Sequence, residues 1–113
     1  MSAKSSKAKG RRLQNLVRDE LRTAIPKLEE DDIKSQTMGM TGEDIVLSPA
    51  ARKKIPYSFE CKNVEKLNIW SALEQAGKNC PEDRTPVLVF TRNHAPTYAV
   101  VPFDHFIQKN IKH

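Results

Sequence analysis

The feature that most constrains the fold is a six-residue segment, Tyr57–Lys62, with the sequence Tyr-Ser-Phe-Glu-Cys-Lys. Its aromatic, alternating residues follow a proline and predict a β-strand. Because successive side chains of a strand point to opposite faces, Glu60 and Lys62 share one face while Phe59 and Cys61 share the other. An exposed ion pair on such a strand would contribute little, and a covered one is costly to bury. The pair is therefore a candidate for function.

A second signal lies upstream, where Asp44 begins a short apolar strand, 44–48, after the glycine-containing loop 38–42. An aspartate followed on the next strand by Glu-x-Lys is the pattern that metal-dependent phosphodiester cleavage requires. The carboxylates of Asp44 and Glu60 would bind a hard cation, and Lys62 would lie beside the attacking water or a phosphate oxygen. Glu43 is expected to point to the other face.

Asp44 together with Glu60-Cys61-Lys62 resembles the signature of the PD-(D/E)XK nucleases, with Glu43 in place of the proline. The surrounding order of segments strengthens the resemblance. A helix opens at Lys9–Gln14, and a glycine-containing approach to the aspartate, the Glu-x-Lys strand and a second helix follow. This order is similar to archaeal-type Holliday-junction resolvases and small phage-encoded relatives, and it covers nearly the whole chain, from about Lys9 to Phe106.

The resemblance implies an α/β, restriction-endonuclease-like fold, with a central mixed sheet of about five strands flanked by helices. It implies a Mg²⁺-dependent, structure-selective endodeoxyribonuclease that acts on branched DNA as a Holliday-junction resolvase, with Mn²⁺ as a substitute metal. The metal would be held by Asp44, Glu60 and a backbone carbonyl, that of Cys61, while Lys62 assists the chemistry. A homodimer is also implied, because cutting two opposed strands of a junction needs two sites.

A first helix is expected from Gly10 to about Ile25, because apolar residues recur at helical spacing and Pro26 ends the pattern. The resembled resolvases carry a metal-site glutamate in this helix, shortly after a Lys-Gly pair. By register that position is Gln14 here, which offers an amide oxygen but no charge. Glu20 has the acidic chemistry but lies nearly two turns later, so both stay open as the residue that completes the site.

Residues 1–9 are rich in Ser, Ala and Lys and lack acids, which predicts a basic disordered tail ahead of a single domain, 10–113. The tail is either solubilising or an arm that binds nucleic-acid phosphates. Basic side chains of the tail and first helix, together with two hydroxyl groups near the predicted acid, are the candidate DNA contacts. They are Lys9, Arg11, Arg12, Arg18, Ser35 and Thr41.

The remaining segments complete the order helix, strand, strand, strand, helix, strand, strand, helix. The expected elements are an edge strand over 33–37, an exposed basic connection over 49–54, a helix over 68–76, strands over 87–90 and 97–101, and a helix from 104 to about 111. Gly77 is expected to stop the second helix. Phe103, Phe106 and Ile107 are expected to pack the last helix back against the core.

Composition limits the chain to one modest domain, since it has 113 residues, of which 38% are hydrophobic and 29% charged. A formal net charge of +5 favours polyanionic partners. There is no long apolar run, so no membrane association is expected. Two cysteines are too few for a disulfide framework, which indicates a reducing cytoplasm, that of the host if the chain is phage-encoded.

Three alternatives stay open. The first is a nicking, flap or general DNA nuclease of the same fold. The second is a non-catalytic DNA-binding module, which Gln14 favours because an acid is expected at that position. The third is a small interaction protein whose basic surface meets an acidic protein partner.

Overall fold

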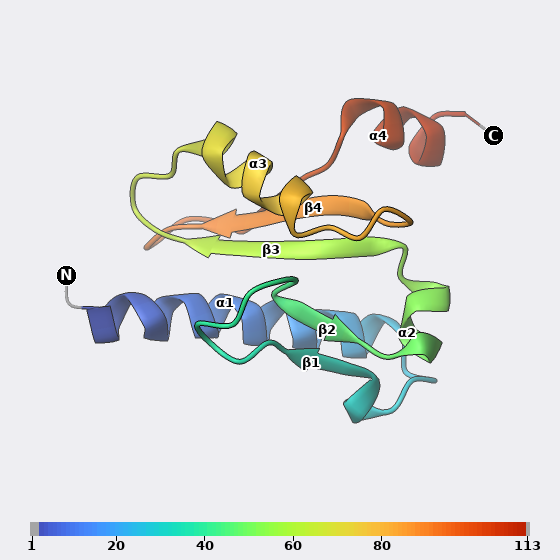
Figure 1. Ribbon diagram of the computed structural model, residues 1–113, viewed down its shortest axis with the longest axis horizontal. Helices are drawn as coiled ribbons and strands as arrows, with labels where there is room; N and C mark the ends of the chain where they lie inside the picture. The colour runs from blue at the N-terminus through green and yellow to red at the C-terminus, as the bar shows by residue number, and fades with distance from the viewer. Residues whose placement is uncertain (1–2, 113) are drawn as a thin grey trace.

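The structure, a computed structural model, describes residues 3–112. Within them the chain forms an α/β arrangement of four α-helices, one short 3-10 helix and five strands (Figure 1). In chain order the elements are α1 (Ala3–Ala24), η1 (Glu30–Asp32), β1 (Ile33–Ser35), β2 (Ile45–Leu47), α2 (Pro49–Lys54), β3 (Tyr57–Asn63), α3 (Ile69–Lys78), β4 (Thr85–Thr91), β5 (Tyr98–Val100) and α4 (Phe103–Asn110).

The strands divide between two small sheets rather than forming the single central sheet expected from the sequence. In the larger sheet β4 lies in the middle, parallel to β3 and antiparallel to β5. The smaller sheet is the antiparallel pair β1–β2, in which Ile33 faces Leu47. The two sheets meet where the Asp44 N–H donates to the Phe59 carbonyl at 3.0 Å. β1 and β2 have only three residues each. This contact therefore brings the end of the pair beside β3, but it does not extend the hydrogen-bond ladder of the larger sheet.

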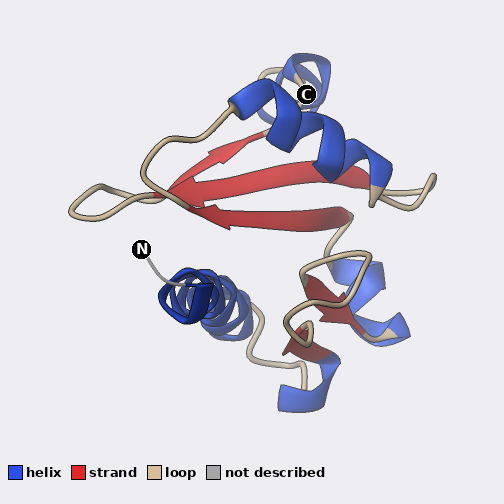
Figure 2. Cartoon of the chain, turned by 60° about the vertical axis from the view of Figure 1, so that its left-hand side comes forward, coloured by secondary structure: helices blue, strands red, loops and turns tan. Residues whose placement is uncertain are grey.

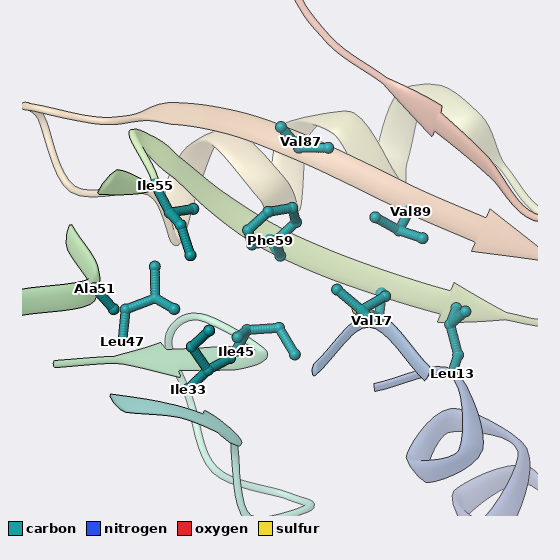
Figure 3. Close-up of a cluster of buried hydrophobic side chains, with 11 residues drawn as sticks. Leu13, Val17, Ile33, Ile45, Leu47, Ala51, Ile55, Phe59, Val87 and Val89 are labelled. Atoms are coloured by element: carbon teal, nitrogen blue, oxygen red, sulfur yellow. The ribbon is translucent and has the colours of Figure 1, made fainter. Parts of the chain in front are cut away.

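Two layers enclose β3 and β4. Helix α1 and the β1–β2 pair lie on one side of the larger sheet, and α3 lies on the other (Figures 1 and 2). Alternation along the strands sends one set of side chains toward α1 and the small sheet, where they form the main core (Figure 3). That core consists of Leu13, Val17, Ile33, Ile45, Leu47, Ala51, Ile55, Phe59, Cys61, Val87 and Val89. The opposite set includes Leu88, which is buried under Ala72 and Ala76 of α3.

Helix α1 begins at Ala3 and not at Gly10, so the expectation of a disordered tail is wrong for residues 3–9; Met1 and Ser2 lie outside the described residues. Alanine and lysine are good helix formers, and tertiary contacts hold this first part in place. The Asn63 side chain donates to the Lys9 carbonyl at 2.9 Å, and the Lys9 ammonium is buried against Glu65. None of the helices in the described part of the chain is long and apolar enough to cross a membrane.

The segment 49–54, expected to be an exposed connection, is the short helix α2. Ser48 is its N-cap and accepts a hydrogen bond from the Ala51 N–H at 3.1 Å, while Pro49 occupies the first turn. The Ser48 hydroxyl also donates to Asp32 at 2.6 Å, which ties the helix to the 3-10 turn before β1. Ala51 is fully buried, so α2 closes the end of the main core.

The two later helices also differ from expectation. Asn68 caps α3 by accepting from the Ser71 N–H at 3.1 Å, and the helix continues through Gly77, its expected stop, to Lys78. Helix α4 forms, yet none of its residues is fully buried, and Phe103 and Phe106 are exposed. The expectation that both phenylalanines pack against the core is therefore wrong.

Candidate active site at the outer edge of β3

Asp44 is fixed beside β3 by three hydrogen bonds. Its N–H donates to the Phe59 carbonyl at 3.0 Å, its carbonyl accepts from the Gln36 N–H at 2.8 Å, and its Oδ2 accepts from the Cys61 N–H at 2.7 Å. Phe59 and Cys61 are alternate residues of β3, so both use the strand edge that β4 leaves free. Gly42 precedes the acid with φ of +99°, a conformation that favours glycine and turns the chain into β2.

Glu60 and Lys62 share one face of β3, as the alternation predicted, and Glu60 is buried. Lys62 Nζ lies 3.6 Å from Glu60 Oε2, and the Asn79 amide donates to Glu60 Oε1 at 3.4 Å. Asn79 is the C-cap residue of α3. Sequence reasoning missed it, because a polar residue after a helix carries no signal until the fold brings it over β3.

Two carboxyl groups are crowded together here. Burial raises the pKa of Asp44, and the hydrogen bond from the Cys61 N–H and the positive charge of Lys62 only partly offset this. The pKa of Glu60 is raised by burial and, next, by the negative charge of Asp44. In both groups burial is the main cause, and the nearby Lys62 charge offsets it only in part.

The structure brings one of the two candidates on α1 to the acids. The Gln14 side chain is buried and close enough to hydrogen-bond with Asp44, whereas Glu20 is exposed. Gln14 Oε1 is buried without a hydrogen-bond partner. An orphaned buried carbonyl oxygen costs free energy, and this one belongs to a side chain that contacts a site carboxyl group. Gln14 and not Glu20 therefore joins the acid pair.

The donor set fits a hard cation such as Mg²⁺. Within residues 3–112 no three or more Asp, Glu, His or Cys side chains are grouped to hold a metal ion. However, Mg²⁺ keeps several waters and needs few carboxylates, so two acids suffice. The Cys61 thiol is not part of this set, because it lies in the core and burial raises its pKa. The Cys61 carbonyl points to the same strand edge as its N–H, toward Asp44.

A cleft of about 450 Å³ opens onto Asp44. One wall is the loop Met40–Gly42, and the other is the end of α3 with Gln75, Lys78 and Asn79. Thr41, expected as a phosphate contact, therefore lies in the cleft. Lys78 was not anticipated. It follows Gln75 by three residues, which places both on the same side of the helix.

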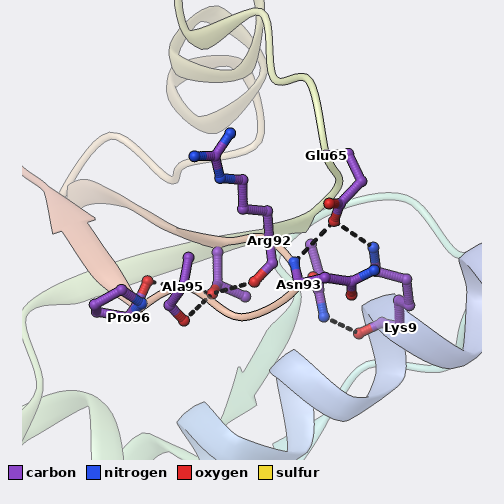
Figure 4. Close-up of polar contacts among 8 residues, drawn as sticks. Lys9, Glu65, Arg92, Asn93, Ala95 and Pro96 are labelled. Atoms are coloured by element: carbon purple, nitrogen blue, oxygen red, sulfur yellow. Dashed lines mark hydrogen bonds and ion pairs between the residues drawn. The ribbon is translucent and has the colours of Figure 1, made fainter.

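The other candidate DNA contacts separate into two groups. Lys9 is buried and its ammonium is 2.9 Å from Glu65, which also accepts from the Asn93 N–H at 2.8 Å (Figure 4). The expectation that Lys9 contacts DNA is therefore wrong, because its charge is used inside the fold. Arg11 and Arg12 are exposed on α1.

Arg18 and Ser35 are occupied by neighbours. Arg18 Nε lies 2.9 Å from Asp19, and its Nη1 donates to Asn15 Oδ1 at 3.2 Å. The Ser35 hydroxyl donates to the same Asn15 oxygen at 2.8 Å. Ser35 thus joins β1 to α1 through Asn15, whereas both partners of Arg18 lie within α1.

Glu43 points away from the site, as the alternation predicted. Its carboxylate lies 3.3 Å from Arg52 Nη2 and 3.8 Å from Arg84 Nε. Arg84 is buried and also donates to the carbonyls of Ile55 and Tyr57. This cluster holds the turn into β3 together with Glu43, the residue before Asp44. Nothing in the sequence pattern predicted the cluster.

Comparisons with family models, with curated protein sequences and with solved structures gave no significant match to this chain.

Proposed function

We propose that this protein is a Mg²⁺-dependent endodeoxyribonuclease of the restriction-endonuclease-like, PD-(D/E)XK kind, and that its substrate is branched DNA. The observation that carries the proposal is the contact of half-buried Asp44 with buried Glu60, next to Lys62 and to the Gln14 side chain. Two adjacent carboxyl groups, one buried and one half-buried, with a single ammonium beside them are unfavourable to fold around when both are ionised, and a cation site explains why they are retained.

Each residue has a distinct role in this proposal. Asp44, Glu60 and Gln14 hold the cation, together with the carbonyl of Cys61. When bound, Mg²⁺ lowers the pKa of a water molecule and neutralises charge on the scissile phosphate. Lys62 donates to the attacking water or to the phosphate oxygen that gains negative charge.

Supporting residues keep these groups in place. The Cys61 N–H holds the Asp44 carboxylate against the strand, and the Asn79 amide orients Glu60. Both hydrogen bonds come from groups that the fold fixes, so the carboxylates need little rearrangement when the cation binds.

The surroundings of the site suit a sugar-phosphate backbone. The cleft at Asp44 offers the Thr41 hydroxyl and the Lys78 ammonium on opposite walls. Arg11 precedes Gln14 by one helical turn, so its exposed guanidinium lies on the neighbouring surface. A domain of 113 residues with loops this short has little structure for reading bases, which favours recognition of shape and phosphates.

The test is cleavage of end-labelled four-way junction, flap and linear duplex DNA, with Mg²⁺ or with EDTA. The variants are Asp44→Asn and Lys62→Ala, and Glu20→Gln is the matched control because it removes an exposed acid outside the site. We expect metal-dependent cleavage of the junction by the wild type and the control, and a loss of at least about 100-fold in both site variants.

The other outcomes separate the alternatives. Equal cleavage of flap and duplex would keep the site but replace the junction preference with general or flap nuclease activity. Binding of all substrates without cleavage under any metal would make this a DNA-binding module. Absence of any salt-sensitive binding would favour a protein partner instead.

A further inference from the structure

Two aromatic side chains continue the row of residues that begins at Lys62. Lys62, Phe90 and Tyr98 are register partners across β3, β4 and β5, and such partners project from the same face of a sheet. This is the face that α3 covers in part, because Leu88, the alternate residue before Phe90, is buried under α3. The aromatic pair therefore lies on the same face as the candidate active site and starts one strand away from it.

Phe90 and Tyr98 line a cavity of about 410 Å³ beside the start of α3. Its walls come from the loop after β3 and from the β4–β5 turn, and their apolar lining residues are Val64, Leu67, Ala95 and Pro96. The volume lies in the range of about 300 to 1,000 Å³ that is typical of small-ligand sites. The two ring centroids are 6.0 Å apart, the rings are tilted by 31°, and Tyr98 is 57% exposed. The cavity thus offers aromatic surface that a planar ligand can reach.

The walls of the cavity are joined by the contacts of Glu65 (Figure 4). The Glu65 carboxylate accepts from Lys9 Nζ at 2.9 Å and from the Asn93 N–H at 2.8 Å. These contacts tie the loop after β3 and the β4–β5 turn to α1, so the cavity is formed before any ligand arrives. They also compensate the negative charge of Glu65, the acid in the lining, which would otherwise repel an anionic ligand.

The Arg92 guanidinium lines the same cavity and has no partner of its own. Within residues 3–112 it makes no hydrogen bond or ion pair, and in Figure 4 it points away from the contact between Glu65 and Lys9. The aromatic pair is thus flanked by two cations, Arg92 at the turn and Lys62 on β3. Rings on which bases stack, next to cations that meet phosphates, are the means by which proteins bind single-stranded nucleic acid.

We propose that this cavity takes one unpaired base of the DNA whose phosphate lies at Lys62, with the base stacked on Tyr98 and Phe90 and a neighbouring phosphate on Arg92. The inference rests on the proposed nuclease function, because Lys62 belongs to that site. Stacking accepts any base, so the cavity selects a nucleotide that is free of pairing and does not read sequence. A branch point or flap supplies such a nucleotide, whereas an intact duplex must first release one from its stack.

The first experiment measures binding by fluorescence anisotropy in EDTA, so that neither a metal ion nor cleavage is involved. The probes are a short labelled oligothymidine and an abasic oligomer of the same length, which carries the same phosphates without bases. The wild type should bind the oligothymidine at least about fivefold more tightly than the abasic oligomer.

Three variants assign this preference. Tyr98→Leu should remove it, and Phe103→Leu is the matched control because Phe103 is an exposed aromatic residue of α4 outside the lining of the cavity. Arg92→Gln should weaken the binding of both oligomers by the same factor, since its contact is with phosphate. Circular dichroism confirms that each variant is folded.

A second experiment locates the base on the wild type itself. Oligothymidine that carries one 5-iodouracil is irradiated with the protein, and mass spectrometry of the peptides should find the cross-link on Tyr98 or Phe90. Cross-links confined to other residues would overturn the proposal. So would absence of binding, equal binding of the two oligomers by the wild type, or a base preference that Tyr98→Leu leaves intact.

The cavity and the nuclease site fail separately. Metal-dependent cleavage of junctions by a protein without base preference would overturn the base cavity alone. A base preference that depends on Tyr98, in a protein that cuts no DNA under any metal, would uphold the cavity and overturn the nuclease.

Discussion

Arg84 provides the sharpest test of how the turn into β3 is held. Its side chain is 3% exposed, and Nη2 donates to the carbonyls of Ile55, at 2.6 Å, and of Tyr57. Its Nε lies 3.8 Å from Glu43 Oε2. Arg84→Met keeps most of the aliphatic stem but removes the charge and both hydrogen bonds, so two carbonyls at the start of the strand lose a donor and Glu43 loses a buried partner.

The magnitude follows from these contacts. A hydrogen bond from a charged donor contributes about 1.5 to 3 kcal/mol, and breaking a buried ion pair costs about 3 to 5 kcal/mol. The contributions overlap, and methionine packs favourably, so we expect the free energy of unfolding to fall by about 3 to 5 kcal/mol. For a domain of this size the melting temperature should then fall by roughly 15 °C.

The matched control is Arg52→Met, because Arg52 pairs with the same carboxylate at 3.3 Å but its side chain is 44% exposed. An exposed pair contributes less than about 1 kcal/mol, so this variant should unfold almost as the wild type does. Urea denaturation followed by circular dichroism measures both. Equal losses in the two variants, or a loss under 1 kcal/mol for Arg84→Met, would refute the reasoning.

Three further predictions concern the site and its supports. Because the pKa values of Asp44 and Glu60 are raised in the folded protein, the folded state holds protons that the unfolded state releases above about pH 4. The contribution of this pair is therefore most favourable at low pH and is lost as pH rises through the folded pKa values. Metal-free Asp44→Asn should be more stable than the wild type at pH 8, with a smaller difference at pH 4, as measured by chemical denaturation; a difference independent of pH would contradict this. Lys9→Met should lower the free energy of unfolding by about 1 to 3 kcal/mol, because the Glu65 carboxylate then loses the Lys9 ammonium and keeps only the Asn93 N–H as a donor. The exposed Lys7→Met should change it by less than about 0.5 kcal/mol. Thermal melts compare the two variants. Leu88→Ala, at a fully buried position under α3, should cost about 3 to 5 kcal/mol in urea denaturation; a cost under 1 kcal/mol would mean that α3 does not depend on this contact.

Local sequence pattern was sufficient for the strand that carries the site. Period-two alternation placed Glu60 and Lys62 on one face, and the structure brings Asp44 to the edge of the same strand. The pattern could not choose between Gln14 and Glu20, because both are polar residues beside an apolar helical stripe. That choice depends on how α1 crosses β3, which is a tertiary property.

The residues that support the site were missed for a related reason. Asn79 and Arg84 lie in a polar loop by sequence, and their roles appear only when the fold brings them against β3. Helix α2 did have a local signal, since Ser48 followed by proline is a helix start, but its basic residues favoured a turn. Phe103 and Phe106 have the spacing of a core-facing stripe, and spacing alone does not say whether the core belongs to the same chain.

Cation binding tests the central claim most directly. Free Mn²⁺ can be followed by electron paramagnetic resonance as metal-free protein is added, for the wild type, Glu60→Gln and the exposed-site control Glu20→Gln. If Asp44 and Glu60 form a cation site, the wild type and Glu20→Gln should remove Mn²⁺ from solution with the same affinity, and Glu60→Gln should bind at least tenfold more weakly. Equal binding by all three proteins, or binding by none, would contradict the account, because Asp44 and Glu60 would then lie in contact without a cation to explain them.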